Sequence, residues 1–284
     1  MPDLPRSQVS GIMARAGCMP MSISERHNIN IVGGGSKTIV FAHGYGCDQA
    51  MWRFLVPAFR DSHRIVLFDH VGAGKSDLSQ YSRERYGSLN GYADDVLDIV
   101  DAVCSEPVIF VGHSVSSMIG VLAAIKRPEA FERLVLVGPS PCYINDGDYV
   151  GGFTRPDVEG LLQTLDENHL GWSRAMAPVI MKNAERPELA SELAESFCRT
   201  DPEIAKHFAR VTFLSDNRAD LASVTVPTLV LQCSDDSIAP DSVGEFVHRN
   251  VRGSEFVKLQ ATGHCPHMSG PAEMVRTIAD YLGR

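Results

Sequence analysis

The stretch Val108–Ser116 reads VIFVGHSVS, and it decides how the rest of the chain is interpreted. Its apolar first half, 108–112, predicts a buried β-strand, and the apolar segment 115–126 predicts a helix that Pro128 ends. A serine at the sharp turn between such a strand and helix exposes its Oγ above the edge of the sheet. We therefore expect Ser114 to be a nucleophile.

The turn departs from the usual pentapeptide, Gly-x-Ser-x-Gly, at its last position. Gly112 supplies the first glycine, whereas Ser116 stands in the place of the second. Serine is still small, so the helix can approach the strand. The alternative is a chance occurrence of these residues in an ordinary turn, and the position of Ser114 between a predicted strand and a predicted helix argues against it.

Other short apolar runs flank this stretch on both sides. The predicted strands among them are 28–32, 38–42, 64–69, 133–138, 228–233 and 255–259. Further helical patterns occur at 89–103, 241–249 and 272–282. Because strands that alternate with helices form parallel sheets covered on both faces, the sequence predicts an α/β fold.

The alternation breaks in the second half of the chain. Residues 141–216 carry only helical patterns, among them Asp201 as an N-cap before Pro202 at the first helical position. We therefore expect a core made of residues 23–140 and 217–284, with 141–216 inserted as a helical lid. Such an insertion is expected over the carboxyl ends of the strands, where open α/β sheets bind ligands.

The chemistry of Ser114 requires two partners. A serine hydroxyl is a poor nucleophile at neutral pH and needs a base, which an acid must orient. On sheets of this kind the nucleophile, the acid and the base follow in that order along the chain. His264 follows the last predicted strand, where the base is expected. Asp235 and Asp236 follow the strand 228–233, where the acid is expected, and the residues alone leave both candidates open.

Acyl transfer also needs N–H donors for the developing oxyanion. One is the backbone N–H of the residue after the nucleophile, which is Val115. The other is expected from the segment HGYG at 43–46, after the strand 38–42, because its glycines let the backbone turn an N–H inward. Tyr45 is the candidate donor, with its side chain at the mouth of a pocket.

Four histidines can also be interpreted as metal ligands or as structural residues. His264 and His267 are three residues apart, as metal ligands can be, but no further cluster of His, Cys or Asp at a fixed spacing supports a metal site. We therefore expect neither a metal nor another cofactor. His43 ends a strand and His113 precedes the nucleophile, so both are expected to have structural roles.

The segment VGAGKS at 71–76 resembles a phosphate-binding loop. That motif requires glycine at position 69, where this chain has Asp69. The two glycines, Gly72 and Gly74, are therefore expected to serve turn geometry instead.

The overall composition limits the possible partners and compartments. The 284 residues are 44% hydrophobic and 21% charged, and the formal net charge is −9. This acidic balance argues against nucleic acids and anionic membranes, and no apolar run approaches the roughly 18 residues of a membrane span. The seven cysteines, without a CxxC pair, predict reduced thiols and a cytoplasmic protein. Residues 1–22 are expected to form a flexible N-terminal extension rather than a secretion signal.

Four segments together resemble a known group of proteins. They are HGYGCDQ at 43–49, GHSVS at 112–116, GPSPCYIND at 138–146 and GHCPHMS at 263–269. They resemble the RsbQ-like α/β-hydrolases of the bacterial sigma-B stress pathway, whose group includes the plant karrikin and strigolactone receptor hydrolases. The resemblance, from about residue 21 to the C-terminus, implies the α/β-hydrolase fold: a mostly parallel sheet flanked by helices, with an inserted four-helix lid over an apolar pocket.

The resemblance also implies which residues form the site. It implies Ser114, Asp236 and His264 as a catalytic triad. It places five substrate-binding residues around the pocket: Tyr45, Tyr143, Phe153, Trp172 and Phe213. Related proteins commonly have phenylalanine where this chain has Tyr45.

Two functions are consistent with these residues. The first is that of a serine esterase, which hydrolyses small apolar carboxylic esters or lactones. The second is that of a signalling hydrolase or receptor, which binds or slowly hydrolyses a small apolar ligand and regulates a partner protein. Both use the same triad, so the triad cannot distinguish them. Haloalkane dehalogenase and epoxide hydrolase activities are disfavoured, because their nucleophile at this turn is aspartate and not a serine such as Ser114.

Overall fold

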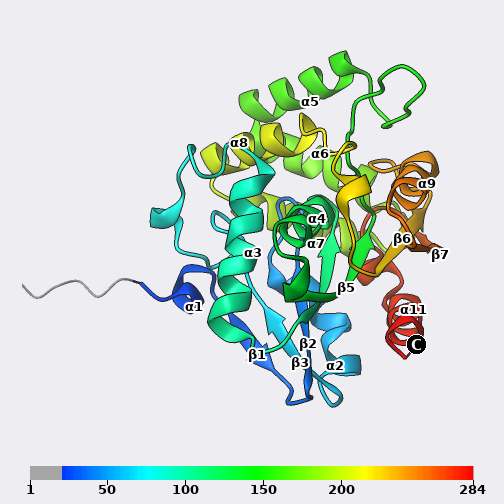
Figure 1. Ribbon diagram of the computed structural model, residues 1–284. Coiled ribbons are helices and arrows are strands. Elements are labelled where there is room, and N and C mark those ends of the chain that lie inside the picture. The colour runs from blue at the N-terminus through cyan, green and yellow to red at the C-terminus, as the bar shows by residue number, and fades with distance from the viewer. Residues whose placement is uncertain (1–20, 284) are drawn as a thin grey trace, which may run out of the picture.

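A computed structural model of the protein describes residues 21–283. Its centre is one sheet of seven strands in the order β1-β3-β2-β4-β5-β6-β7 (Figure 1). The strands are β1 Asn30–Val32, β2 Lys37–Ala42, β3 His63–Leu67, β4 Val108–His113, β5 Phe131–Val137, β6 Thr228–Ser234 and β7 Glu255–Thr262. The short β1 runs antiparallel to β3 at one edge, and all other neighbouring strands are parallel. The predicted mostly parallel sheet is therefore confirmed.

Helices connect the strands and cover the sheet. The α-helices are α1 Ile23–Arg26, α2 Val56–Phe59, α3 Leu89–Val103, α4 Val115–Lys126, α5 Arg155–Glu167, α6 His169–Met181, α7 Pro187–Arg199, α8 Pro202–Phe213, α9 Asp241–Asn250, α10 Pro266–Ser269 and α11 Pro271–Leu282. Short 3₁₀ helices are η1 Gln49–Phe54, η2 Leu78–Gln80, η3 Pro128–Ala130 and η4 Leu221–Ser223. The helices before and after strand β4, α3 and α4, have the bounds that the sequence predicts.

Each face of the sheet has its own apolar layer, because successive residues of a strand point to opposite faces. On one face, Val40 and Phe110 pack with residues of α3, α4 and α9. On the other, Phe41 and Val111 pack with residues of η1, α2 and α11. All four side chains are fully buried. Burial on both faces explains why these strands are continuous apolar runs rather than alternating ones.

The short helices α1, α2 and α10 were not expected from the sequence. Each spans four residues, too few for a helical apolar period to be recognised. A capping box between Ser22 and Glu25 starts α1. The first strand begins at Asn30 and not at the predicted residue 28, because Asn28 has a φ of 46°, in the left-handed region, and not the extended backbone of a strand.

Between β5 and β6 the chain forms α5, α6, α7 and α8, which we call the helical insertion. In Figure 1, α5 and α8 lie above the sheet. The four helices of the insertion span residues 155–213. The start of α8 is the predicted one: the Asp201 side chain accepts hydrogen bonds from the backbone N–H groups of Glu203 at 2.9 Å and Ile204 at 3.1 Å. Pro202 occupies the first helical position, as expected.

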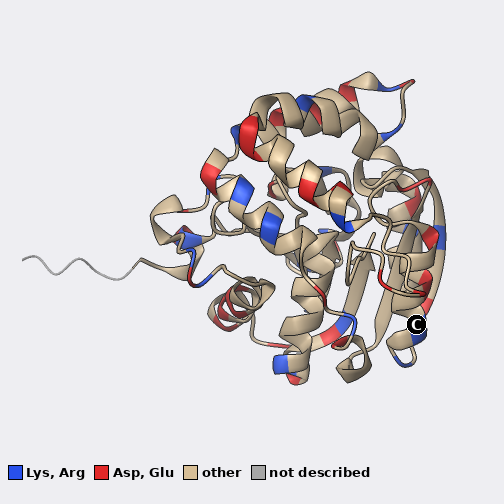
Figure 2. Ribbon diagram, turned by 90° about the horizontal axis from the view of Figure 1, so that it is seen from above, with Lys and Arg blue, Asp and Glu red and all other residues tan. Residues whose placement is uncertain are grey.

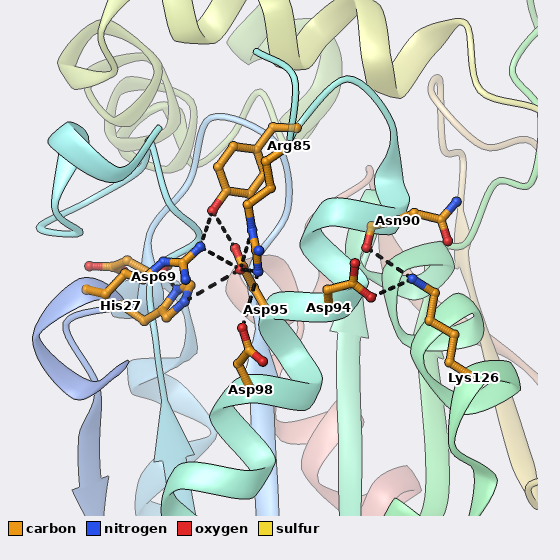
Figure 3. A network of polar contacts seen from close by, with 10 residues as sticks. His27, Asp69, Arg85, Asn90, Asp94, Asp95, Asp98 and Lys126 are labelled. Carbon is orange, nitrogen blue, oxygen red and sulfur yellow. Dashed lines mark hydrogen bonds and ion pairs between the residues drawn. The ribbon is translucent and has the colours of Figure 1, made fainter. Parts of the chain in front are cut away.

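A buried carboxylate anchors α1 to α3 (Figure 3). Asp95 of α3 is fully buried and accepts hydrogen bonds from Arg26 Nη2 at 2.8 Å and Arg85 Nη2 at 2.6 Å. It also accepts one from the Tyr86 hydroxyl at 2.7 Å. These partners offset the desolvation of the carboxylate, so the network fixes the beginning of the described chain on the core.

Replacing Asp95 with alanine is expected to lower the free energy of unfolding by about 3 kcal/mol, because the largely buried Arg26 guanidinium loses its counter-charge, whereas Arg85 keeps its ion pair with Asp98 at 3.2 Å. The neighbouring Asp94 is a matched control. Its side chain is 50% exposed and pairs with Lys126 at 2.6 Å, so Asp94→Ala should cost no more than about 1 kcal/mol. Urea denaturation measures both values, and equal losses would contradict the anchoring role of Asp95.

Both signs of charge occur on the outer helices. In the view of Figure 2, Lys and Arg residues lie among Asp and Glu residues along the helical insertion. Surface ion pairs such as Arg53–Glu192, at 2.6 Å, connect the insertion to the core. Within residues 21–283, no helix combines the length and the apolar character needed to cross a bilayer.

Candidate active site

Ser114 lies at the turn between β4 and α4, where the sequence predicts it. Its backbone angles are φ 56° and ψ −122°, in the left-handed region that non-glycine residues rarely adopt. A hydrogen bond from its N–H to the Val137 carbonyl of β5, at 2.8 Å, holds this strained turn. Its hydroxyl does not cap α4, and therefore remains available to a base.

Two further side chains form a hydrogen-bonded chain with Ser114. His264 follows β7, and its Nε2 lies 2.8 Å from Ser114 Oγ. Its Nδ1 lies 2.7 Å from Oδ2 of Asp236, which follows β6. The other carboxylate oxygen of Asp236 accepts hydrogen bonds from the backbone N–H groups of Ile238 and Ala239, at 2.8 Å and 3.1 Å. All three members of the chain are buried, so the arrangement is shielded from water.

The neighbouring carboxylate takes no part in this chain. The Asp235 side chain is 67% exposed and lies 3.5 Å from Lys182 Nζ at the surface. Its φ of 49° marks the sharp turn that follows β6. The structure therefore brings Asp236, and not Asp235, to His264.

The two predicted oxyanion donors lie near Ser114. Val115 begins α4, and Tyr45 belongs to the loop that follows β2. Within the described residues, neither backbone N–H donates to a protein acceptor. The Tyr45 loop needs glycine at position 46, because Gly46 has φ 68° and a Cβ there would lie 2.3 Å from the ring of Phe197. Both N–H groups are thus free to bind an oxyanion.

A small cavity lies beside Ser114. Its lining residues are Tyr45, Cys47, His113, Ser114, Tyr143, Trp172, Ile180, Leu193, Phe197, Thr212, Phe213, Ile238, His264 and Cys265. The helical insertion supplies a large part of this lining. The free space is small, because the centre of a water-sized group can occupy only about 30 Å³. A wider groove of about 650 Å³ lies between η1 and the end of α7, and it contains none of the three residues of the Ser114 chain.

Four of the five pocket residues that the resemblance implies line this cavity: Tyr45, Tyr143, Trp172 and Phe213. Phe153 is not among the lining residues; its backbone N–H donates to the Tyr143 carbonyl at 3.1 Å, and its side chain packs against the same apolar cluster. Seven lining residues were not expected from the sequence: Cys47, Ile180, Leu193, Phe197, Thr212, Ile238 and Cys265.

Residues 39–277 match the Alpha/beta hydrolase family, which is far more than half of the chain. The chain belongs to this family. Its seven-stranded sheet, the serine turn after β4 and the acid and base after β6 and β7 fit the family's architecture.

Similar α/β-hydrolases include plant proteins and a solved bacterial structure. Karrikin insensitive 2 receptor CA from Petunia hybrida is 37% identical, over 92% of this chain and 97% of that protein. Strigolactone esterase RMS3 from Pisum sativum is 35% identical, over 94% and 100%. A hydrolase from Oleispira antarctica is 42% identical, with a TM-score of 0.90 over 92% of this chain and 96% of that one. The predicted resemblance to the plant receptor hydrolases is confirmed.

Ser116 departs from the usual α/β-hydrolase turn, and its hydroxyl is fully used. It donates to the His43 carbonyl at 2.5 Å and lies 2.8 Å from His70 Nε2. The His70 backbone N–H in turn donates to His43 Nε2 at 3.1 Å. These bonds fix the backbone just before Tyr45, and so they hold the loop that contains this predicted oxyanion donor.

Tyr45 connects this loop to the helical insertion. Its hydroxyl donates to the Ala205 carbonyl of α8 at 3.0 Å. Its ring lies 6.2 Å from those of Trp172 and Phe213 and 6.0 Å from that of Phe197, measured between centroids. The hydroxyl therefore serves contact with the insertion, while the ring forms part of the cavity wall.

The remaining histidines near the site are buried. His113 Nε2 lies 2.7 Å from the His264 carbonyl, in agreement with a structural role. His267, the alternative metal ligand, packs 4.8 Å from the Trp52 ring, and neither of its ring nitrogens has a partner among the described residues. Within residues 21–283, no group of three or more His, Cys, Asp or Glu is arranged to hold a metal ion.

Because these histidines are buried, we expect the free energy of unfolding to fall at acid pH. Burial lowers the pKa of five of them, for His267 to about 3: His27, His43, His70, His113 and His267. Below about pH 6.5 the unfolded chain binds protons that the folded state does not bind, so stability falls as the pH falls; for His267 the loss is roughly 1.4 kcal/mol per pH unit between about pH 6 and its folded-state pKa of about 3.

The measurement is urea denaturation between pH 7.5 and pH 4.5. In His267→Leu, which removes no hydrogen bond to a described residue, the fall per pH unit should be smaller by about 1.4 kcal/mol. A parent protein whose stability is constant from pH 6.5 to 5 would contradict the assignment of neutral buried histidines.

Proposed function

We propose that the chain is a serine hydrolase that cleaves small apolar carboxylic esters or lactones through an acyl-enzyme on Ser114. The observation that carries this proposal is the continuous chain from Ser114 Oγ through the His264 ring to Asp236, with distances of 2.8 Å and 2.7 Å. A serine, a base and an orienting acid at these distances match the requirements of nucleophilic acyl transfer.

In the proposed first step, Ser114 Oγ attacks the ester carbonyl while His264 Nε2 takes the hydroxyl proton. Asp236 holds the imidazole through Nδ1 and stabilises the imidazolium that forms. The carbonyl oxygen becomes an oxyanion, which in this proposal the backbone N–H groups of Tyr45 and Val115 bind. His264 then returns the proton to the departing alkoxide, which leaves as the alcohol, and the acyl group remains on Ser114.

In the second step a water molecule replaces the alcohol. His264 takes a proton from the water, the resulting hydroxide attacks the acyl carbon, and the bond to Ser114 Oγ breaks. The proton returns to Ser114, and the carboxylic acid leaves. A lactone follows the same steps, except that its alcohol and acid remain one molecule.

The cavity supports a preference for small apolar acyl groups. Its lining is largely aromatic and aliphatic, so it offers no charged partner to an ionised acyl group, whose desolvation would remain uncompensated. Burial of the apolar surface of an acyl group in this cavity contributes about 25 cal/mol per Å² to the free energy of binding. The volume open to the centre of a water-sized group is only about 30 Å³, so the cavity favours short acyl chains unless the insertion moves.

Hydrolysis of p-nitrophenyl esters is expected to be fastest from acetate to butyrate and to fall for longer chains. Trp172→Ala should enlarge the cavity and raise the ratio of octanoate to acetate hydrolysis roughly tenfold. Leu170→Ala, an exposed position on the same helix, should leave the ratio unchanged. The measurement is kcat/KM across the series; activity that rises steadily beyond eight carbons in the parent would contradict the small cavity.

A second candidate function is a ligand-dependent signal to a partner protein. The observation that favours it is the similarity to Karrikin insensitive 2 receptor CA over 97% of that protein's length. Repeated turnover of an ester supports the enzyme alone, whereas a single slow turnover together with ligand-dependent binding of a partner supports the receptor. Pre-steady-state kinetics with an excess of ester distinguishes the two.

A further inference from the structure

The wall of the cavity contains two hydrogen-bond donors that have no acceptor. Thr212 Oγ1 and Trp172 Nε1 are both buried, and neither has a hydrogen-bond partner among the described residues. Both residues line the cavity, and their exposed fractions are only 1% and 3%. Buried donors normally find a partner, so this pair calls for an acceptor that the protein itself does not supply.

Thr212 lacks a hydrogen bond that other serine and threonine residues in the helices make. A helical serine or threonine commonly donates to the carbonyl four residues before it. This bond is made by Thr164 to Gly160 at 2.8 Å, Ser173 to His169 at 2.7 Å, Ser191 to Pro187 at 3.1 Å and Thr277 to Glu273 at 3.0 Å. Thr212 lies in α8 with Phe208 four residues before it, yet its hydroxyl does not make the corresponding bond. The hydroxyl is therefore left available on the cavity side of the helix.

Three other polar side chains of the cavity, those of Tyr45, Cys47 and Cys265, do not replace the missing acceptor, and the Tyr143 hydroxyl interacts with Ser114 instead. The Tyr45 hydroxyl is occupied by the Ala205 carbonyl. Burial raises the pKa values of Cys47 and Cys265, so both remain thiols, which are weak acceptors. An indole N–H is a donor only, and thus Trp172 adds to the excess of donors.

We propose that Thr212 Oγ1 donates a hydrogen bond to a second acceptor oxygen of the substrate, in addition to the carbonyl that Ser114 attacks. This inference rests on the proposed function and narrows it. The substrate class becomes small esters or lactones that carry an ether, ketone or hydroxyl oxygen within the short chains that the cavity favours. A purely hydrocarbon acyl group fills the same space but leaves the donor unsatisfied, which costs binding free energy.

The test uses pairs of esters in which one CH₂ is replaced by oxygen. p-Nitrophenyl methoxyacetate is compared with p-nitrophenyl butyrate, which places the oxygen in the acyl part. 2-Methoxyethyl butyrate is compared with butyl butyrate, which places it in the alcohol part. In Thr212→Val, which keeps the shape and removes the hydroxyl, the kcat/KM ratio of oxygenated to hydrocarbon ester should fall about three- to tenfold for at least one pair. The pair that responds tells which part of the substrate carries the oxygen.

Two further variants separate a hydrogen bond from a change in packing. Thr212→Ser retains the hydroxyl and should keep the parent ratio. Thr164→Val makes the same chemical change on α5, at an exposed position outside the cavity, and should also keep it. Ratios that stay at the parent value in Thr212→Val for both pairs would overturn the proposal.

A binding measurement keeps this test independent of hydrolysis. The dissociation constants of two amide pairs, methoxyacetamide with butyramide and N-(2-methoxyethyl)butyramide with N-butylbutyramide, are measured by NMR titration in the parent and in Thr212→Val. The preference for the oxygenated amide should fall about three- to tenfold in the variant for at least one pair. If the parent hydrolyses neither ester, the serine hydrolase proposal fails, and the amide ratio still decides whether Thr212 binds an oxygen. Amide ratios that are the same in both proteins for both pairs would overturn the Thr212 subsite even when the esters are hydrolysed.

Discussion

Ser114→Ala is expected to lower kcat/KM for a small p-nitrophenyl ester by a factor of at least about 10³. The variant loses the only atom that can form the acyl bond at this turn, while the cavity and the N–H groups of Tyr45 and Val115 remain. These parts still orient the ester, so a small residual rate above that of the uncatalysed reaction should persist. The measurement is the initial rate of nitrophenol release at saturating and subsaturating ester.

Ser191→Ala serves as the control for this prediction. Ser191 lies on α7 at an exposed position, and its hydroxyl donates to the Pro187 carbonyl. The control should retain the parent rate. A Ser114→Ala protein that keeps more than a tenth of the parent rate would contradict a covalent role for Ser114.

The second large effect is expected at the acid. Asp236→Asn should lower kcat by about 10³ to 10⁴, because the amide cannot stabilise the imidazolium and favours the wrong tautomer of His264. The amide can still accept the backbone hydrogen bonds from Ile238 and Ala239, so the loop should keep its conformation and KM should change little.

Asp235→Asn is the matched comparison, since it makes the same change one residue away. Asp235 is exposed and contacts Lys182 rather than His264. The kcat of this variant should remain within about twofold of the parent, as expected for loss of a surface ion pair. A larger loss at position 235 than at position 236 would reverse the assignment of the acid.

The sequence predicts the sheet and the helices beside it because each has a distinct apolar pattern. The amphipathic stripe of 89–103 and the apolar segment 115–126 give α3 and α4 with the observed bounds. The four-residue helices α1, α2 and α10 cannot be predicted in this way. Their starts depend on local capping and proline geometry rather than on periodicity.

The candidate triad can also be predicted, because parallel strands bring their carboxyl ends to one edge of the sheet. Residues that directly follow β4, β6 and β7 must then lie close together, as Ser114, Asp236 and His264 do. The choice between Asp235 and Asp236 depends on the φ of 49° at Asp235, which no spacing reveals.

The wall of the cavity is the part that the sequence does not specify. Leu193 and Phe197 lie four residues apart on α7, the spacing of ordinary helix packing, and nothing in that pattern shows that they face a cavity. Phe153 is predicted to line the pocket, but its side chain packs against the neighbouring apolar cluster and does not line the cavity. The direction of each side chain depends on how the four insertion helices pack together, and this is a tertiary property.

The most direct test of the central claim is covalent labelling of Ser114. The parent protein is treated with a fluorophosphonate, digested and examined by mass spectrometry, beside Ser114→Ala treated in the same way. Attack by an activated serine should leave the phosphonyl group on the peptide that contains Ser114, and the variant should remain unlabelled. Equal labelling of both proteins, or a label on another serine of the parent, would contradict the assignment of Ser114 as the nucleophile.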